Sequence, residues 1–184
     1  MDDADDVLML RAGRGDRVAC QVLVERHLGR TTSFAQRMLG TRTDAEDAAQ
    51  EVFLRVWSAA PRWKAGTARF TTWLHRVAMN VCLDRIARRR ETTQEIPDVA
   101  DDRAQPPEAL AETDTARHVR AALATLPDTQ RAAVTLCHFQ GLRNDEAAEV
   151  LGVSIEALES LLARGRRALR AQLRLIAPAL LGNA

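Results

Sequence analysis

The sequence predicts an all-α protein made of two small helical domains. Alanine, leucine, arginine and glutamate are abundant, whereas tyrosine is absent and aromatic residues make up only 4% of the chain. The abundant side chains lose little rotamer freedom in a helix, so this composition favours helices over sheets. Apolar residues also recur at helical spacing through residues 5–90 and again through 107–176. With 46% apolar residues, the 184-residue chain can bury a core in each of two domains.

A segment of different composition, residues 91–107, separates the two helical stretches. It contains three prolines and few large apolar groups, so burial cannot offset the entropy lost on ordering it. Residues 91–114 hold eight acidic residues and one arginine, which leaves about +8 on the rest of a chain whose formal charge is +1. We therefore expect a first domain at 1–90, a flexible acidic linker at 91–107 and a second domain at 108–184.

The residues capable of chemistry argue against an enzyme or a metalloprotein. Cys20, Cys82 and Cys137 lie far apart without C-x-x-C spacing, and the four histidines are mutually distant and form no HExxH motif. The chain starts with acidic residues, unlike a signal peptide, and arginine interrupts every apolar stretch before it could span a bilayer. We expect a cytoplasmic protein with no cofactor, metal, small-molecule substrate or membrane insertion.

One helix is predicted to start at the capping box Thr43–Glu46, where the Thr43 hydroxyl and the Glu46 carboxylate bind free backbone amides. Behind the box, apolar residues recur at helical spacing as far as Trp57. The opposite face is polar except for Leu54. That face is either simply solvated or a docking surface, and periodicity does not decide between the two.

A second long helix is predicted from about Phe70 to Arg90. It ends in four arginines, Arg85, Arg88, Arg89 and Arg90, which either offset the helix dipole or bind a phosphate backbone. Four cations in six residues exceed what the dipole needs, so we favour phosphate binding.

Aromatic and cationic residues alternate at the start of this second helix. They are Trp63, Lys64, Arg69, Phe70 and Trp73. This composition is typical of surfaces on which single-stranded bases stack beside a charged groove. Tryptophans in a hydrophobic core would give the same pattern, so by itself it does not identify a nucleic-acid site.

The second domain contains a helix-turn-helix pattern. Asn144 is expected to cap a short helix ending at Leu151, Gly152 to supply the turn, and Ser154 to cap a second helix reaching about Arg174. The apolar residues expected to face partner helices are Val153, Leu158 and Leu161. The residues expected to point outward are Ser154, Glu156, Ala157, Glu159, Ser160, Ala163 and Arg164, followed by Arg166, Arg167, Arg170 and Arg174 as phosphate contacts. A generic helical hairpin would place its apolar residues similarly.

Three segments together resemble the extracytoplasmic-function (ECF) sigma factors of the sigma-70 family. Asp44–Trp57 (DAEDAAQEVFLRVW) resembles the helix that binds the polymerase clamp, and Phe70–Asn80 (FTTWLHRVAMN) resembles the helix that binds the minus-10 element. Leu126–Val134 (LPDTQRAAV), with the helix-turn-helix that follows, resembles the domain that binds the minus-35 element. The likeness covers nearly the whole chain in the order of the family.

The resemblance implies partners and roles for particular residues. The partners are RNA polymerase core, promoter DNA and an anti-sigma factor. The residues implied to contact the clamp of the largest polymerase subunit are Asp47, Gln50, Glu51, Leu54 and Arg55. Those implied to bind the minus-10 element are Trp63, Lys64, Arg69, Trp73, Arg76, Asn80, Arg85 and Arg88. Those implied to bind the minus-35 element are Ser154, Glu156, Glu159, Ser160, Arg164, Arg166 and Arg167.

One segment departs from the family pattern. Where many members have Gly-Thr-Val-Lys-Ser-Arg, this chain has Glu156–Leu161 (EALESL), which loses two cations and gains two acids. We therefore expect weaker minus-35 binding from this segment and phosphate contacts shifted to Arg164 and beyond. The alternative function is a helix-turn-helix regulator that acts without polymerase, but such a protein needs a dimer surface and gives no reason for the polar face of residues 44–57.

Overall fold

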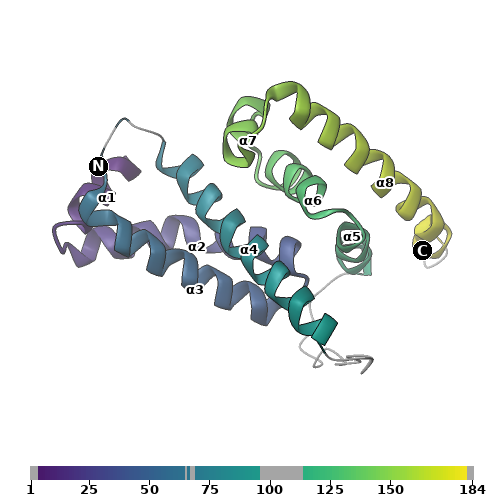
Figure 1. Cartoon of the computed structure of the whole chain (residues 1–184), viewed down its shortest axis with the longest axis horizontal. Helices are drawn as coiled ribbons and strands as arrows, with labels where there is room; N and C mark the ends of the chain where they lie inside the picture. Colours follow the sequence, from purple (N-terminus) through teal and green to yellow (C-terminus); the bar gives the residue numbers. More distant parts are fainter. Residues whose placement is uncertain (1–3, 65, 67–68, 96–113, 182–184) are drawn as a thin grey trace.

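The computed structural model describes residues 4–64, 66, 69–95 and 114–181, and this part of the chain consists of helices and turns without a strand. The helices form two groups that lie side by side (Figure 1). The first group comprises α1 (Asp5–Ala12), α2 (Arg17–Leu39), α3 (Arg42–Ala59), the 3-10 turn η1 (Ala60–Arg62) and α4 (Phe70–Glu95). The second comprises α5 (Asp114–Ala124), α6 (Asp128–Val134), the π-helical turn η2 (Thr135–Phe139), α7 (Asn144–Leu151) and α8 (Ile155–Leu181). The predicted all-α fold class is confirmed.

The core of the first group lies where α2, α3 and α4 pack together. Each of these helices buries apolar side chains on one face, which is the physical origin of the helical periodicity in the sequence. The largest fully buried ones are Leu23, Phe34 and Met38 from α2, Val52 and Val56 from α3, and Phe70 and Val81 from α4.

The start of α3 is set by Thr41, two residues before the predicted cap. The Thr41 hydroxyl accepts a hydrogen bond from the Asp44 amide at 3.1 Å, so the helix begins at Arg42. The predicted capping box was therefore wrong: Thr43 lies inside the helix, and the Glu46 carboxylate pairs with the Arg42 guanidinium at 2.8 Å. Both threonines have an acid three residues later, so the sequence offered two equivalent starts.

Helix α1 closes one end of the first group, and Gly13 at its end allows the close approach. A Cβ atom at Gly13 would lie 2.3 Å from the Ala60 carbonyl oxygen and 3.1 Å from Cα of Pro61. Both atoms belong to the backbone of η1, so a flexible side chain cannot move aside to make room. Only glycine fits at this contact.

In the second group, α7 and α8 form the predicted helix-turn-helix. Gly152 adopts a left-handed conformation with φ of 66° between the two helices. The Ser154 hydroxyl accepts from the Ala157 amide at 3.2 Å and caps α8 as predicted. Helix α8 packs on α6 through the side that carries Gly165. A Cβ atom at Gly165 would lie 2.8 Å from Cγ2 of Val134.

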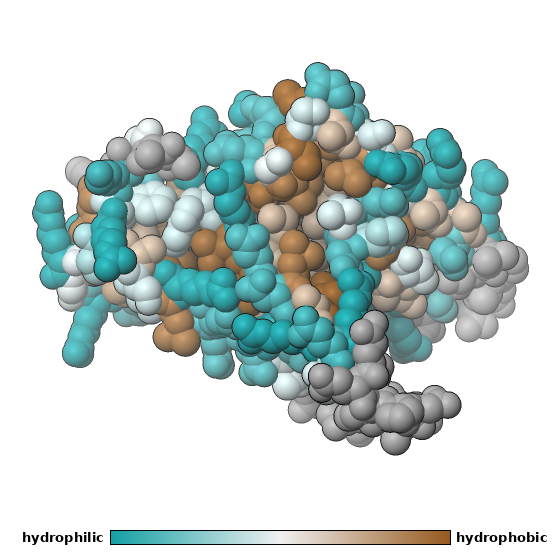
Figure 2. All heavy atoms as spheres, in the orientation of Figure 1, coloured by the Kyte–Doolittle hydropathy of each residue, from teal (hydrophilic) through white to brown (hydrophobic). Residues whose placement is uncertain are grey.

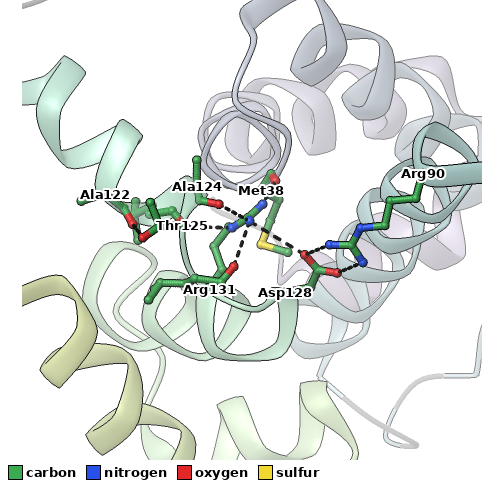
Figure 3. Close-up of polar contacts among 9 residues, drawn as sticks. Met38, Arg90, Ala122, Ala124, Thr125, Asp128 and Arg131 are labelled. Atoms are coloured by element: carbon green, nitrogen blue, oxygen red, sulfur yellow. Dashed lines mark hydrogen bonds and ion pairs between the residues drawn. The ribbon is translucent and has the colours of Figure 1, made fainter. Parts of the chain in front are cut away.

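A nearly buried arginine joins the two groups. The Arg131 side chain is 12% exposed and donates to the carbonyl oxygens of Leu123, Ala124 and Leu126 at 3.0, 2.9 and 3.0 Å, which fixes the turn between α5 and α6. Its Nη1 also donates at 2.7 Å to the carbonyl of Met38, in the last turn of α2 (Figure 3). One guanidinium therefore organises the second group and docks the first against it.

Two helices extend beyond their predicted ends. Helix α4 reaches Glu95 instead of Arg90, and α8 reaches Leu181 instead of Arg174. The predictions ended each helix at a run of arginines, but arginine itself favours helix. The first proline after Arg90 is Pro97, so nothing breaks α4 before Glu95. Helix α4 thus enters the segment expected to be the linker, and the rest of that segment, residues 96–107, lies outside the described residues.

Hydrophilic side chains cover most of the face shown in Figure 2, and apolar atoms are visible mainly toward the middle, where the two groups meet. The buried apolar residues of both groups belong to one cluster. The two groups are therefore packed against each other and not separated by solvent.

The contact at Gly13 can be tested by adding a single methyl group. Gly13→Ala should lower the free energy of unfolding by about 1–3 kcal/mol, because the methyl group has to displace backbone atoms. Gly29→Ala is the matched control: Gly29 is an exposed residue within α2 whose Cβ would meet nothing within 4 Å. That change should stabilise the chain by about 0.5–1 kcal/mol through helix propensity. Urea denaturation measures both, and equal effects of the two substitutions contradict the close contact.

Candidate functional site

The outer face of α3 carries the residues expected to bind polymerase. Asp47, Gln50 and Leu54 are exposed, and Leu54 has 66% of its surface open to solvent. Helix α3 packs on α2, α4 and η1 with its other side. The structure therefore places an exposed leucine among polar side chains on a helix face turned away from the second group.

The other two residues of that face, Glu51 and Arg55, are half-buried and belong to an ion-pair network with α4. The Glu51 carboxylate pairs with Arg55 Nη2 at 2.6 Å and with Arg85 Nη2 at 3.1 Å. Burial raises the pKa of Glu51, but hydrogen bonds from Arg55 and Arg85 and their charges outweigh it, so that pKa lies below its usual value. Glu51 is therefore ionised at neutral pH, and its ion pair with Arg85 links α3 to α4.

The tryptophans expected at the minus-10 surface belong to an aromatic cluster. The Trp63 ring lies 5.1 Å from that of Trp73 and 5.9 Å from that of Phe70, centroid to centroid, with edge-on geometry. His27 extends the cluster 5.3 Å from Phe70, and its Nε2 lies 2.9 Å from Asp5. Trp63 and Trp73 are half-buried, so they contribute to the core and still present part of their surface to solvent. No sequence pattern pointed to His27, whose ring reaches the cluster through the packing of α2 on α4.

The exposed face of α4 lies against α7 of the second group. Arg69, Arg76 and Asn80, at intervals of seven and four residues, share this face and are all exposed. Arg69 Nη1 is 3.3 Å from the Glu146 carboxylate, and Arg76 Nη2 donates at 2.5 Å to the carbonyl of Glu149. Nothing in the sequence predicted that α7 would contact the surface expected to bind the minus-10 element.

Three of the four arginines at the end of α4 form intramolecular ion pairs. Arg85 pairs with Glu51, Arg89 with Asp44 at 2.6 Å, and Arg90 with Asp128 at 2.8 Å. Arg85, Arg88 and Arg89 also line a hollow of about 340 Å³ together with Leu39, Asp44 and Ile86. Much of the positive charge expected to bind phosphates is therefore already paired with carboxylates of the chain itself.

Helix α7 starts in a different way from the prediction. Asn144 is its first residue and not its cap, because the Glu146 carboxylate accepts from the Arg143 amide at 3.1 Å and so satisfies the free donor before the helix. Glu146 thus has two tasks, capping α7 and pairing with Arg69.

The outward surface of α8 matches its prediction with one exception. Val153 is 37% exposed instead of packed on the partner helices, whereas Leu158 is fully buried. All the residues predicted to point outward are exposed: Ser154, Glu156, Ala157, Glu159, Ser160, Ala163, Arg164, Arg166, Arg167, Arg170 and Arg174. Ile155, the first residue of α8, is 45% exposed as well. Val153 lies in the turn before α8 begins at Ile155, so helical spacing did not apply to it.

The acid at the start of this surface carries its full charge. Hydrogen bonds from its own backbone amide and from Ser154 lower the pKa of Glu156, which therefore stays ionised at neutral pH. Anything that binds here meets two acids, Glu156 and Glu159, followed by the cations from Arg164 onward.

The described residues also bear on metal, membrane and thiol sites. No group of three or more histidine, cysteine or acidic residues that could hold a metal ion is found there. None of the described helices is long and apolar enough to cross a membrane. Burial raises the pKa of the Cys82 thiol to about 12, which makes it a poor nucleophile.

Comparison with known proteins gives matches along most of the chain. Residues 23–92 match Sigma-70 region 2, and residues 117–169 match Sigma-70, region 4. The ECF RNA polymerase sigma factor SigE of Mycolicibacterium smegmatis is 36% identical over 153 residues, which make up 80% of this chain and 59% of SigE. The ECF RNA polymerase sigma factor SigM of Mycobacterium tuberculosis is 34% identical over 167 residues, covering 89% of this chain and 81% of SigM. The structure of CnrH in complex with the cytosolic domain of CnrY is similar with a TM-score of 0.69 and 29% identity, over 94% of this chain and 99% of that one.

The Glu51 network makes stability depend on pH. Because the folded pKa of Glu51 is depressed, its contribution is fully present above its unfolded pKa, about 4.3, and is lost as the pH falls through the folded value. Glu51→Gln should therefore destabilise the chain at pH 7 and progressively less below pH about 4. Asp47→Asn, on the same face, is the control. Urea unfolding across pH 3–7 measures the difference, and a deficit that stays constant with pH contradicts the assignment.

Proposed function

The chain belongs to the ECF sigma factors of the sigma-70 family, and on that premise we propose which of its surfaces bind RNA polymerase and promoter DNA. Members of this family bind the polymerase core and direct transcription initiation, and they are not enzymes. We take each surface in turn, with the observation that supports it.

We assign polymerase binding to the outer face of α3. Leu54 is the observation that carries the assignment, because a leucine with 66% of its surface exposed among polar side chains gains most from being covered by a partner. Asp47 and Gln50 flank it and are exposed, while Glu51 and Arg55 hold the face rigid through their ion pairs. The clamp of the largest polymerase subunit is the proposed partner.

We assign minus-10 recognition to α4 and the segment before it. The half-exposed rings of Trp63 and Trp73 provide surfaces on which an unpaired base can stack, and Asn80 provides both a donor and an acceptor for a base edge. Cations along α4 and in the segment before it suit the DNA backbone. They are Lys64, Arg69, Arg76, Arg85 and Arg88.

We assign minus-35 recognition to the exposed surface of α8. Ser154, Glu156, Glu159 and Ser160 occupy the first turns, where a helix inserted in the major groove meets base edges. A carboxylate there can accept from a cytosine amino group. Arg164, Arg166 and Arg167 lie farther along and suit phosphates.

Two further proposals concern the setting of the protein. Polymerase and chromosome are both in the bacterial cytoplasm, so we place the protein there. We also propose that an anti-sigma factor controls it, as is common in the family, and CnrH provides a parallel because it was solved in complex with the cytosolic domain of CnrY.

A helix-turn-helix regulator acting without polymerase would explain α7 and α8 but would leave Leu54 without a role.

The polymerase assignment can be tested with two exposed aliphatic residues of the same group. Leu54→Asn should weaken binding to purified core polymerase about tenfold or more, as expected for a residue at the centre of an interface. Val18→Asn is the matched control, because Val18 is 63% exposed on α2 and lies outside the proposed face. Titration of labelled chain with core, together with promoter-directed transcription, measures the effect, and circular dichroism checks the fold. Equal affinities of the two variants refute the assignment to α3.

A further inference from the structure

Two large apolar side chains are exposed at the turn that leads into α8. Val153 lies in the turn itself, and Ile155 is the first residue of the helix. Apolar residues that are exposed singly need no explanation, but these two flank the same capping residue, Ser154. The start of α8 therefore combines an apolar surface with the polar residues already described.

The backbone holds Ile155 in a fixed position. Gly152 turns the chain before the helix with φ of 66°. Ser154 then caps α8 through its hydroxyl, and its carbonyl accepts from the Leu158 amide at 3.0 Å. Leu158 is fully buried and anchors the first turn to the rest of the second group. Ile155 thus projects from a turn that is held on both sides.

The location of α8 leaves this first turn open to a partner. Helix α8 lies along the outer edge of the second group, with α5, α6 and α7 on its inner side (Figure 1). The second helix of a helix-turn-helix enters the major groove and presents its N-terminal residues to base edges. Under the proposed assignment of α8 to the minus-35 element, Ile155 therefore faces the edge of a base pair.

The chemistry of the first turn favours one base over the others. Thymine is the base that offers an apolar group in the major groove, its C5 methyl, whereas guanine offers two acceptors, N7 and O6. Arginine and lysine are the usual partners of guanine, but the first cation of α8 is Arg164. Glu156 and Glu159 disfavour guanine beside Ile155, because carboxylate oxygens are acceptors too.

We propose that Ile155 is a specificity residue of the minus-35 site, which reads a thymine by packing its side chain against the C5 methyl group. This inference rests on the proposed assignment of α8 to the minus-35 element. The contact removes apolar surface of both partners from water, and burial of one methyl group changes an affinity about three- to fivefold.

The test removes one methyl group from the DNA and one side chain from the protein. The chain is combined with core polymerase, and the minus-35 sequence that this holoenzyme prefers is selected from random duplex DNA. Each thymine of the selected element is then replaced, one at a time, by uracil, which lacks the methyl group but pairs in the same way. Ile155→Ala removes the proposed contact. Leu28→Ala is the matched control, because Leu28 is 41% exposed on α2, outside the helix-turn-helix.

Competition between thymine and uracil duplexes, followed by fluorescence anisotropy, measures the contribution of the methyl group. With the unsubstituted chain, uracil at one position should weaken binding about three- to fivefold. With Ile155→Ala, the thymine and uracil duplexes should bind equally at that position, because the methyl group has lost its partner. Leu28→Ala should keep the full difference, and circular dichroism checks that both variants fold.

An Ile155→Ala holoenzyme that distinguishes thymine from uracil as strongly as the unsubstituted one overturns the proposal. A loss of affinity that is the same for both duplexes also overturns it, since Ile155 then contacts something other than the methyl group. So does a selected element in which no thymine responds to uracil. In these three cases the selection itself upholds the proposed function. A holoenzyme that selects no minus-35 sequence refutes the assignment of α8, and the inference fails with it.

Discussion

The structure depends on the need of a nearly buried guanidinium for hydrogen bonds. Burial lowers the pKa of Arg131, and the charge of Asp128 opposes that shift. Arginine remains charged in proteins, so its N–H groups require acceptors wherever it is buried. Three carbonyls at the α5–α6 turn and the Met38 carbonyl of α2 supply them. Asp128 beside it pairs with Arg90 of α4, so a second contact between the groups starts from the same point (Figure 3).

The polar contacts of the interface differ in how much water reaches them. Around Arg131 the partners are carbonyls in a sheltered setting, where hydrogen bonds to a charge are strong. At the far end, Arg69 and Arg76 reach α7 across a surface open to water. Helix α4 also packs directly on α7, so this end of the interface is held by more than the two arginines.

The sequence predicted what depends on periodicity and missed what depends on contacts between the groups. Helical spacing and turn residues located α3, α4, α7 and α8 and placed Leu54, Glu156 and Arg164 on outward faces, as the structure confirms. Helix ends were less predictable, because two threonines with equal capping potential precede α3 and arginine does not stop a helix. The contacts of Arg76 and Arg131 with distant carbonyls left no sequence pattern, since every residue has a carbonyl. Nothing in the sequence marked Glu146 as the partner of Arg69. The roles of the proposed binding residues stay predictions.

The central claim is that the two groups of the free chain are packed together, through one apolar cluster and through the carbonyls that Arg131 binds. Small-angle X-ray scattering of the free chain, measured from low to high salt, tests it most directly, because salt screens exposed ion pairs but hardly affects apolar contacts. The account predicts, at low and at high salt, a curve matching the one calculated from the packed structure. A chain that is extended and two-lobed at low salt would contradict it.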